Sequence, residues 1–357
     1  MFWAAGLVSM LVAFAATKLS IALSLRGGVL DMPNMRSSHS EPVPRLGGIG
    51  ILVAVAVAAG VLATIGPHLS ETPSLLTRPT MVMIGAGLGM AAIGFYDDLY
   101  GLRPAVKLLC QLVLAGAIAA WGCHIESVQI ADWGPFALGL ASVPVTILWL
   151  TGFANIFNFM DGINGISGVS GATFFLFFSI FAWLGSSPEL TLFGVIFASA
   201  CIGFLPHNFP VARTFMGDTG SLMLGIVLGF YVVYLAQRSP GMLLPLLLVC
   251  SIYLWDSGFT ILLRLRRREN ILHPHRSHLY QRLVKAGHSH ARITTLYWIL
   301  HLVMGLLALA CYRSGGLLRA GIATLAVFIL AAFTGAVFWV EKRWLREKSS
   351  QNHGTAA

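Results

Sequence analysis

The sequence has few charged residues and very few acidic ones. Only 10% of the 357 residues are charged, and Asp and Glu together number 14. A soluble globular domain has about 25% charged and about 45–50% apolar residues, whereas 57% of this chain is hydrophobic and its mean hydropathy is +0.79. Soluble, disordered and fibrous classes are therefore excluded. The apolar runs are continuous rather than alternating, so the composition predicts a helical, polytopic membrane protein.

Cysteine is scarce too, and it forms no pairs along the chain. The five cysteines stand singly, without a C-x-x-C spacing, and we interpret them as small apolar residues inside membrane spans. A basic segment is also missing before the first apolar stretch, residues 2–25, which is too long for the hydrophobic region of a signal peptide. We expect this stretch to be retained as the first span.

Apolar windows of about 20 residues, the length that crosses a bilayer, occur along the whole chain. We predict an all-α integral membrane protein, a bundle of about 10–11 transmembrane helices. Residues 1–340 would form one membrane domain, and residues 341–357 a basic cytoplasmic tail. The windows are 3–25, 47–66, 80–96, 107–123, 136–154, 168–186, 190–207, 220–237, 242–263, 293–312 and 317–340.

Lysine and arginine are unevenly distributed between the two sets of alternating loops. The set that begins with residues 26–46 carries eighteen of them, and the opposite set carries three. Because basic loops stay in the cytoplasm, we predict an outside N-terminus and a cytoplasmic C-terminus in a bacterial plasma (inner) membrane. The net charge of +9 then suits anionic lipids and substrates. No basic domain with interleaved aromatic residues is present to bind nucleic acid.

The same basic loops contain nearly all of the acids, amides and histidines that could carry chemistry. The first group is Asp97-Asp98, which closes a span, followed by Lys107, which opens the next. Adjacent carboxylates repel each other unless a cation lies nearby. Mg²⁺ or a substrate cation would offset this repulsion, and the alternative is an ordinary solvated helix end.

A second group repeats polar residues at a spacing of three. Asn155, Asn158, Asp161 and Asn164 would lie roughly on one side of a helix end, and the glycines that follow allow a ligand to approach the backbone closely. Amides together with a carboxylate suit the coordination of a hard cation and the recognition of a base. A simple polar loop would have little reason to repeat this spacing.

A third group is Phe215-Met216-Gly217-Asp218-Thr219-Gly220-Ser221, just before an apolar helix. Asp218 is placed as an N-cap or first-turn residue, and the glycines expose backbone N–H groups. Capping alone would explain the aspartate. The whole string favours a site for a metal held by oxygen ligands or for a phosphate.

A fourth group is rich in histidine and includes His273, His275, Arg276 and His278. The H-x-H-x-x-H spacing could bind zinc, but the chain offers no cysteine there. A basic surface loop is another reading. A cationic clamp on a diphosphate fits better, because Arg276 supplies forked donors beside imidazoles. A fifth string, residues 31–48, is a polar loop that enters the second span.

In this order, the five strings resemble the polyprenyl-phosphate N-acetylhexosamine-1-phosphate transferase family, glycosyltransferase family 4. This family includes phospho-MurNAc-pentapeptide translocase and the enzymes that initiate O-antigen and teichoic acid linkage synthesis. The likeness runs from about residue 31 to 300, and its most specific parts are Asn158-Phe159-Met160-Asp161-Gly162 and the Asp218 string. The histidine string looks most like the O-antigen-initiating branch, since the peptidoglycan branch typically shows three consecutive histidines.

The resemblance implies a transferase whose active site lies at the cytoplasmic face and depends on Mg²⁺, with Mn²⁺ as a substitute. Undecaprenyl phosphate in the membrane lipid would attack the β-phosphorus of a UDP-N-acetylhexosamine, giving polyprenyl-diphospho-sugar and UMP. The implied metal ligands are Asn158 and Asp218, and the implied catalytic residues are Asp97, Asp98, Asp161 and Lys107. The implied substrate contacts are Asn164 and Phe215 for uracil, and His275, Arg276 and His278 for phosphates or sugar.

Two departures from the family pattern affect this carry-over. Many members have a third acid after the Asp pair, where this chain has Leu99-Tyr100-Gly101, and many have Asp where this chain has Asn164. A lipid-linked-sugar transporter or flippase is the alternative from another class, and it predicts flux without UMP and an inverted repeat, which we do not find. A CDP-alcohol phosphotransferase would need two carboxylate pairs on adjacent helix turns. The sequence does not identify the sugar or the polysaccharide pathway, and it leaves open whether the protein is a homodimer.

Overall fold

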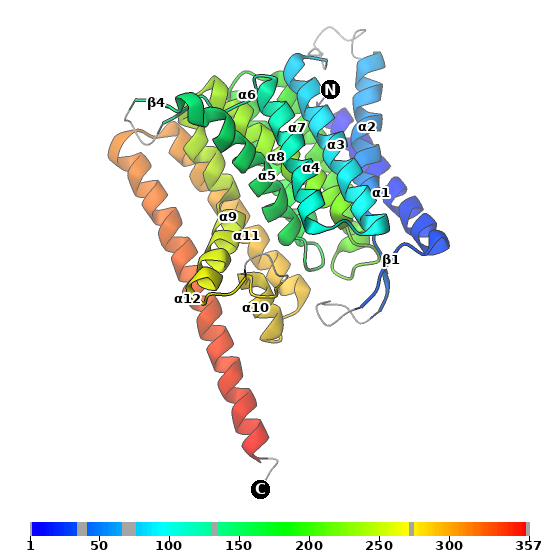
Figure 1. The fold of residues 1–357 in the computed structure, drawn as a ribbon, viewed down its shortest axis with the longest axis vertical. Helices are drawn as coiled ribbons and strands as arrows, with labels where there is room; N and C mark the ends of the chain where they lie inside the picture. Colours follow the sequence, from blue (N-terminus) through cyan, green and yellow to red (C-terminus); the bar gives the residue numbers. More distant parts are fainter. Residues whose placement is uncertain (1, 34–40, 66–75, 130–133, 271–274, 355–357) are drawn as a thin grey trace.

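The computed structural model describes residues 2–33, 41–65, 76–129, 134–270 and 275–354, and these are mostly helical (Figure 1). Two short antiparallel pairs are present, β1 (Leu30–Asp31) with β2 (Val43–Pro44) and β3 (Ser127–Val128) with β4 (Phe136–Ala137). The helices are α1 (Phe2–Gly27), α2 (Gly48–Ile65), α3 (Arg78–Tyr100), α4 (Pro104–Ala120), α5 (Ser142–Phe159), α6 (Ile166–Leu184), α7 (Pro188–Asn208), α8 (Gly217–Arg238), α9 (Leu243–Arg266), α10 (Leu279–Lys285), α11 (His290–Arg313) and α12 (Gly316–Gly354).

The predicted all-α membrane architecture is confirmed. Each of the eleven apolar windows overlaps a helix, and within the described residues nine helices are long and apolar enough to cross a membrane. The two remaining windows correspond to α2 and α4, which are apolar but shorter. The additional helix, α10, is too short to span and lies in the histidine-rich loop.

One predicted window is displaced. We placed a span at 136–154, but residues 136–137 pair with residues 127–128 in a hairpin, so α5 begins at Ser142 and ends at Phe159. Apolar residues in a short strand and in a helix have the same hydropathy, and the window could not separate them. The shift moves Asn155 and Asn158 into the last turns of α5.

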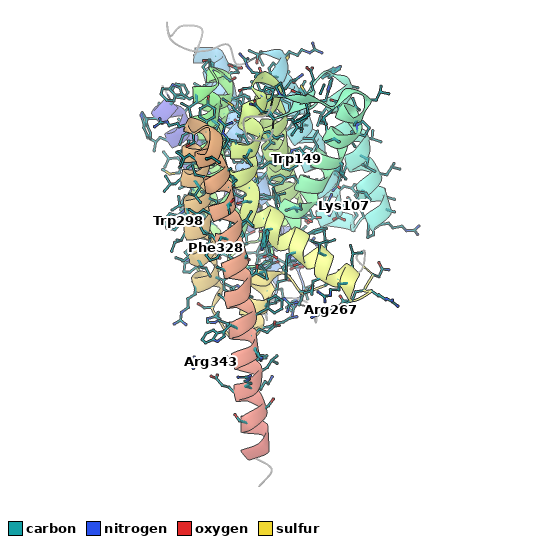
Figure 2. The ribbon with its side chains drawn as sticks, turned by 90° about the vertical axis from the view of Figure 1, so that its left-hand side faces the viewer. Lys107, Trp149, Arg267, Trp298, Phe328 and Arg343 are labelled. Carbon is teal, nitrogen blue, oxygen red and sulfur yellow. The ribbon has the colours of Figure 1, made fainter. Side chains whose placement is uncertain are left out.

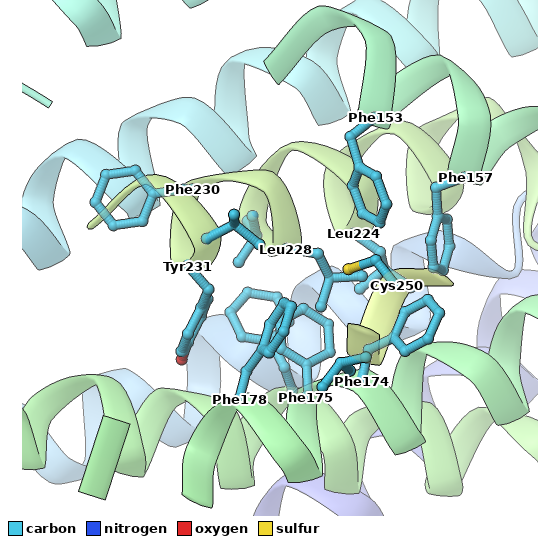
Figure 3. Close-up of a cluster of buried hydrophobic side chains, with 14 of the residues drawn as sticks. Phe153, Phe157, Phe174, Phe175, Phe178, Leu224, Leu228, Phe230, Tyr231 and Cys250 are labelled. Atoms are coloured by element: carbon cyan, nitrogen blue, oxygen red, sulfur yellow. The ribbon is translucent and has the colours of Figure 1, made fainter. Parts of the chain in front are cut away.

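The core is centred on α8, which is buried over 94% of its span and packs against α3 and α5. Aromatic side chains of α5 and α6 pack against it: Figure 3 shows Phe175 and Phe178 near Tyr231 of α8, and Phe157 and Phe174 at the other side of the cluster. In a bilayer the lipid tails are as apolar as these side chains, so close packing rather than escape from water holds such helices together. This rigid core fixes the position of the first turn of α8.

One end of the bundle collects the loops that follow α1, α3, α5, α7 and α9 (Figure 1). The last helix, α12, leaves the bundle at this same end and continues as a single helix to Gly354 (Figures 1 and 2). The division that we predicted at residue 340 therefore falls inside a continuous helix. All of the polar strings in the described residues lie at or near this end.

Candidate active site

The site is built where the last turn of α3 meets the first turn of α8. The carboxylate of Asp98 is fully buried and accepts hydrogen bonds from the backbone N–H groups of Asp218 and Thr219, both at 2.9 Å, and from the Thr219 hydroxyl at 2.7 Å. A carboxylate is stabilised by the unpaired N–H groups and the dipole at a helix N-terminus. Asp98 of α3 thus caps α8, and the side chain of Asp218 makes no such cap.

A glycine makes this close approach possible. Gly217 begins α8 with a φ of +68°, in the left-handed region that glycine adopts easily. A Cβ atom at this position would lie 2.7 Å from Oδ2 of Asp98, too close for a side chain. The Phe-Met-Gly-Asp string therefore needs its glycine so that the end of α3 can reach α8.

Lys107 connects the acids of the two helices. Its ammonium group lies 2.9 Å from Oδ2 of Asp97 and also bonds to Oδ2 of Asp218, and all three side chains are only 13–16% exposed. Asp97 is held from its other oxygen by the backbone N–H of Leu102, at 2.5 Å. The Asp pair, the lysine and the Asp218 string, far apart in sequence, thus form one charged cluster.

Asn158 joins this cluster from the end of α5. Its Nδ2 group donates to Oδ1 of Asp218 at 2.9 Å and to the Ser221 hydroxyl at 2.8 Å. Asn155, one turn earlier, instead donates to Oε1 of Gln111 on α4 at 2.6 Å. Since α5 ends at Phe159, the helical spacing that we inferred for residues 155–164 does not extend to Asp161. Of that group, the hydrogen bonds place Asn158 directly on Asp218.

Asp161 lies in the loop between α5 and α6 and adds a further acid. Burial raises the pKa of Asp161 to about 7, and the negative charges of Asp218 and Asp98 act in the same direction. Two cations partly balance the negative charge of these acids. One is Lys107, beside Asp97, and the other is Arg45, whose Nε lies 3.0 Å from Oδ1 of Asp98. Such a cluster favours an added cation, because each acid is then stabilised in its ionised form.

The chemistry of the donors fits Mg²⁺. This ion usually binds through one or two carboxylates together with water and substrate phosphates, which Asp218 and the amide oxygen of Asn158, with Asp97 beside them, can satisfy. Among the described residues no three His, Cys, Asp or Glu side chains form a metal site by themselves. The site therefore suits a metal that is completed by its substrate, and it does not resemble a closed structural zinc site.

Asn164 and Phe215, the predicted uracil contacts, are tied to neighbouring elements. The Asn164 side chain donates to the carbonyl of Pro210 at 3.2 Å. The backbone carbonyl of Asn164 accepts a hydrogen bond from the hydroxyl of Thr294 on α11 at 2.7 Å. The backbone N–H of Phe215 donates to the carbonyl of Pro44 in β2 at 2.8 Å. Both residues lie in loops of the same end of the bundle as the charged cluster.

The histidine loop contains one buried and one half-buried imidazole. Nδ1 of His278 lies 3.1 Å from Oδ1 of the buried Asp256 on α9, and the rings of His275 and His278 are 5.0 Å apart. Burial and the neighbouring basic groups His278 and Arg264 lower the pKa of His275 to about 4. His275 is therefore neutral at physiological pH, and Arg276 is the permanent cation beside it.

Arg276 has an unused hydrogen-bond donor. Its Nη2 atom is buried and has no hydrogen-bond partner among the described residues. Buried polar atoms almost always have a partner, and an exception calls for an explanation such as a water molecule or an ion. A guanidinium group in this state is suited to an anion with several oxygen atoms.

The histidine loop packs on the loop that carries Asp161. The Tyr280 hydroxyl donates to the carbonyl of Phe159 at 3.0 Å, and any side chain at Gly162 would overlap that hydroxyl. The tyrosine is fully buried in this contact. The end of α5 thus contacts both the Asp218 string, through Asn158, and the histidine loop, through the carbonyl of Phe159.

Two residues of this region were missed from the sequence. Arg45 lies in the string 31–48, where no spacing set it apart from the other polar residues. Asp256 is a lone acid inside an apolar run, and an ionisable residue inside a span is itself a signal of function. His273 and His39, which belong to the histidine group and to the string 31–48, lie outside the described residues.

Comparisons with known proteins identify the relatives of this chain. The family model of glycosyl transferase family 4 matches residues 80–236. The chain is 31% identical over 318 residues to the decaprenyl-phosphate N-acetylglucosaminephosphotransferase of Mycolicibacterium smegmatis, covering 82% of this chain and 78% of that protein. It is 28% identical to the probable undecaprenyl-phosphate N-acetylglucosaminyl 1-phosphate transferase of Bacillus subtilis, covering 85% and 83%. A phospho-N-acetylmuramoyl-pentapeptide-transferase of Staphylococcus epidermidis is 24% identical, covering 74% and 84%.

Proposed function

Since this chain belongs to glycosyl transferase family 4, we infer that it is a membrane enzyme that transfers a sugar 1-phosphate to a polyprenyl phosphate. We propose that the donor is a UDP-N-acetylhexosamine and that the acceptor is undecaprenyl phosphate. A phosphate oxygen of the lipid forms a bond to the β-phosphorus of the donor. The bond between the two phosphates of the donor breaks, and its electron pair leaves with UMP.

The observation that carries this proposal is the meeting of Asp97, Lys107, Asn158 and Asp218 at one end of the bundle. Phosphoryl transfer depends on positioning and on neutralising charge more than on covalent catalysis. A lipid nucleophile and a water-soluble donor can meet only at a membrane face. A cluster of acids, an amide and a cation at the ends of spans provides the groups for this reaction.

The contacts of the two adjacent acids support different roles for them. Both oxygens of Asp98 are occupied by the first turn of α8 and by Arg45. Asp97 instead bonds to Lys107 and is partly exposed, so we assign the lipid phosphate to Asp97 and Lys107. Asp218 and Asn158 would hold Mg²⁺, with Asp161 in support. When bound there, Mg²⁺ would neutralise negative charge on the donor's diphosphate.

We also assign Arg276 a role: it would bind the diphosphate of the donor, together with the Mg²⁺ held by Asp218 and Asn158. Replacing Arg276 with Lys is expected to lower kcat/KM for the donor by one to two orders of magnitude, about 1.4–2.8 kcal/mol. The reason is that lysine offers a point charge in place of a planar fork of donors. The dependence of activity on Mg²⁺ concentration should stay nearly unchanged, because the assigned metal ligands are intact.

Mg²⁺ titrations of the wild type and of Arg276→Lys check this assignment. A large shift in the Mg²⁺ midpoint of the variant would contradict it. Zinc in the purified protein, with activity lost to a zinc-selective chelator and restored by Zn²⁺, would support the zinc reading of the histidine loop instead.

We propose that the site faces the cytoplasm of a bacterium, with the C-terminus on the same side. The support is the excess of Lys and Arg in the loops at this end. In cells that carry Ser350→Cys, in the exposed end of α12, an impermeant maleimide should label the protein only after the membrane is permeabilised. Wild-type protein is the control for the native cysteines, and ready labelling of intact cells would reverse the orientation.

The test of the whole proposal is UMP release. Purified protein in membranes is incubated with undecaprenyl phosphate and Mg²⁺ or Mn²⁺, and with each of several UDP-N-acetylhexosamines. UDP-N-acetylglucosamine is the first choice, since the names of two relatives specify this sugar. The form of the histidine string supports an enzyme that initiates O-antigen or another envelope polysaccharide. Transport of a lipid-linked sugar without UMP formation would favour the flippase alternative.

A further inference from the structure

Asp256 is a fully buried acid on α9. Its side chain is completely inaccessible to solvent, and a buried carboxylate is costly unless hydrogen bonds satisfy it. Oδ1 lies 3.1 Å from Nδ1 of His278 and accepts from the backbone N–H of Leu279 at 2.9 Å, and Oδ2 accepts from the hydroxyl of Tyr297 at 2.6 Å. A backbone N–H of Tyr280 lies 3.4 Å from Oδ2.

Most of these donors belong to the histidine loop. The loop reaches α10 at His278, and Asp256 bonds to this residue and to the two residues that follow. Because the acceptor is a carboxylate, Nδ1 of His278 must carry the proton, which fixes the tautomer and the plane of the ring. Asp256 therefore sets both the start of α10 and the orientation of its first imidazole.

The far side of the loop is held by α12. Nη1 of Arg282 lies 2.8 Å from Oε2 of Glu341, and Nε of Arg282 donates to the carbonyl of Ser277 at 3.0 Å. Arg276, whose buried Nη2 has no hydrogen-bond partner in the part of the chain that the structure describes, lies directly before this doubly anchored segment. Two acids on two different helices thus fix the backbone on which Arg276 is mounted.

We propose that Asp256 is a positioning residue for the nucleotide-sugar donor: it holds the segment 275–280 so that Arg276 meets the donor's diphosphate. This inference rests on the proposed function, and it assigns to Asp256 no contact with substrate. It requires that the loss of Asp256 acts on the donor and not on the lipid acceptor, whose assigned residues lie on α3 and α4.

The test is steady-state kinetics of Asp256→Asn with both substrates varied. We expect the KM for the UDP-sugar to rise at least tenfold, and the KM for undecaprenyl phosphate to stay within about twofold of wild type. Tyr297→Phe is the matched control, since it removes a donor from the same carboxylate on the side of α11 and leaves the loop contacts intact. Its donor KM should change less than threefold, and the melting temperatures of both variants are measured in parallel.

A double-mutant cycle shows whether Asp256 acts through Arg276. In an Arg276→Lys background, Asp256→Asn should raise the donor KM less than threefold, because the guanidinium group that Asp256 positions is already absent. If Asp256→Asn is not recovered as folded protein, Asp256→Glu takes its place in the cycle, since the longer side chain displaces the carboxylate from Nδ1 of His278 and from the backbone N–H of Leu279. Additive effects in either cycle would overturn the proposal.

The remaining outcomes separate this inference from the proposed function. If wild-type protein releases no UMP with any UDP-sugar, the proposed function fails. If wild-type protein is active while Asp256→Asn keeps the wild-type donor KM, or raises the KM values for donor and acceptor equally, Asp256 is a structural residue and the positioning role is overturned.

Discussion

Replacing Asp218 with Asn is expected to lower kcat at least a thousandfold, about 4 kcal/mol in the barrier, with the fold intact. The α8 cap is provided by Asp98, which binds the backbone of Asp218 and not its side chain. The side-chain carboxylate of Asp218 is therefore not needed to cap α8. It bonds instead to Lys107 and Asn158 in the site. An amide of the same shape removes the full negative charge that would hold Mg²⁺.

Three measurements check this result: kcat from UMP release, the melting temperature, and binding of Mn²⁺ followed by electron paramagnetic resonance. We expect the melting temperature to stay near that of wild type and Mn²⁺ binding to weaken. Glu347→Gln, the same exchange at an exposed acid on α12, is the control and should leave all three unchanged. Activity above about a tenth of wild type would mean that Asp218 has only a local structural role.

The spans and the ends that carry the site could be predicted from the sequence. Each span needs about 20 apolar residues in a row, which is a property of the chain and not of its packing. Asp97 and Asp98 at the end of α3, and Asp218 in the first turn of α8, follow from the same limits of apolar segments. The start of α5 could not be predicted, because the adjoining hairpin is apolar as well.

The partners of the polar residues could not be predicted in the same way. Asp97 and Asp98 are neighbours in sequence, yet their partners differ. In the packed structure Asp98 accepts hydrogen bonds from the N-terminus of α8, whereas Asp97 pairs with Lys107. Arg45 and Asp256 each act on an element that is far away along the chain. Contacts of this kind depend on tertiary structure, and a single sequence has no spacing that encodes them.

The different partners of the two adjacent acids predict two different failures. Asp98→Ala would leave two backbone N–H groups and a threonine hydroxyl buried without an acceptor, and would remove the nearer of the two acids that pair with Arg45. Each buried donor that is left without an acceptor costs about 1–3 kcal/mol. We therefore expect Asp98→Ala to lower the melting temperature sharply and to reduce the yield of folded protein.

Asp97→Ala is expected to keep a melting temperature close to that of wild type and to lose kcat at least a hundredfold, about 2.8 kcal/mol. Asp97 bonds to Lys107 and to one backbone N–H, and after its loss Lys107 keeps its bond to Asp218, so no buried charge is left without a partner. What is lost is the acid that we assign to the lipid phosphate, together with the orientation of Lys107. Thermal melts and UMP release on both variants separate the two roles. Equal melting temperatures for the two variants would contradict a structural role for Asp98, and near-normal turnover of Asp97→Ala would remove Asp97 from the reaction.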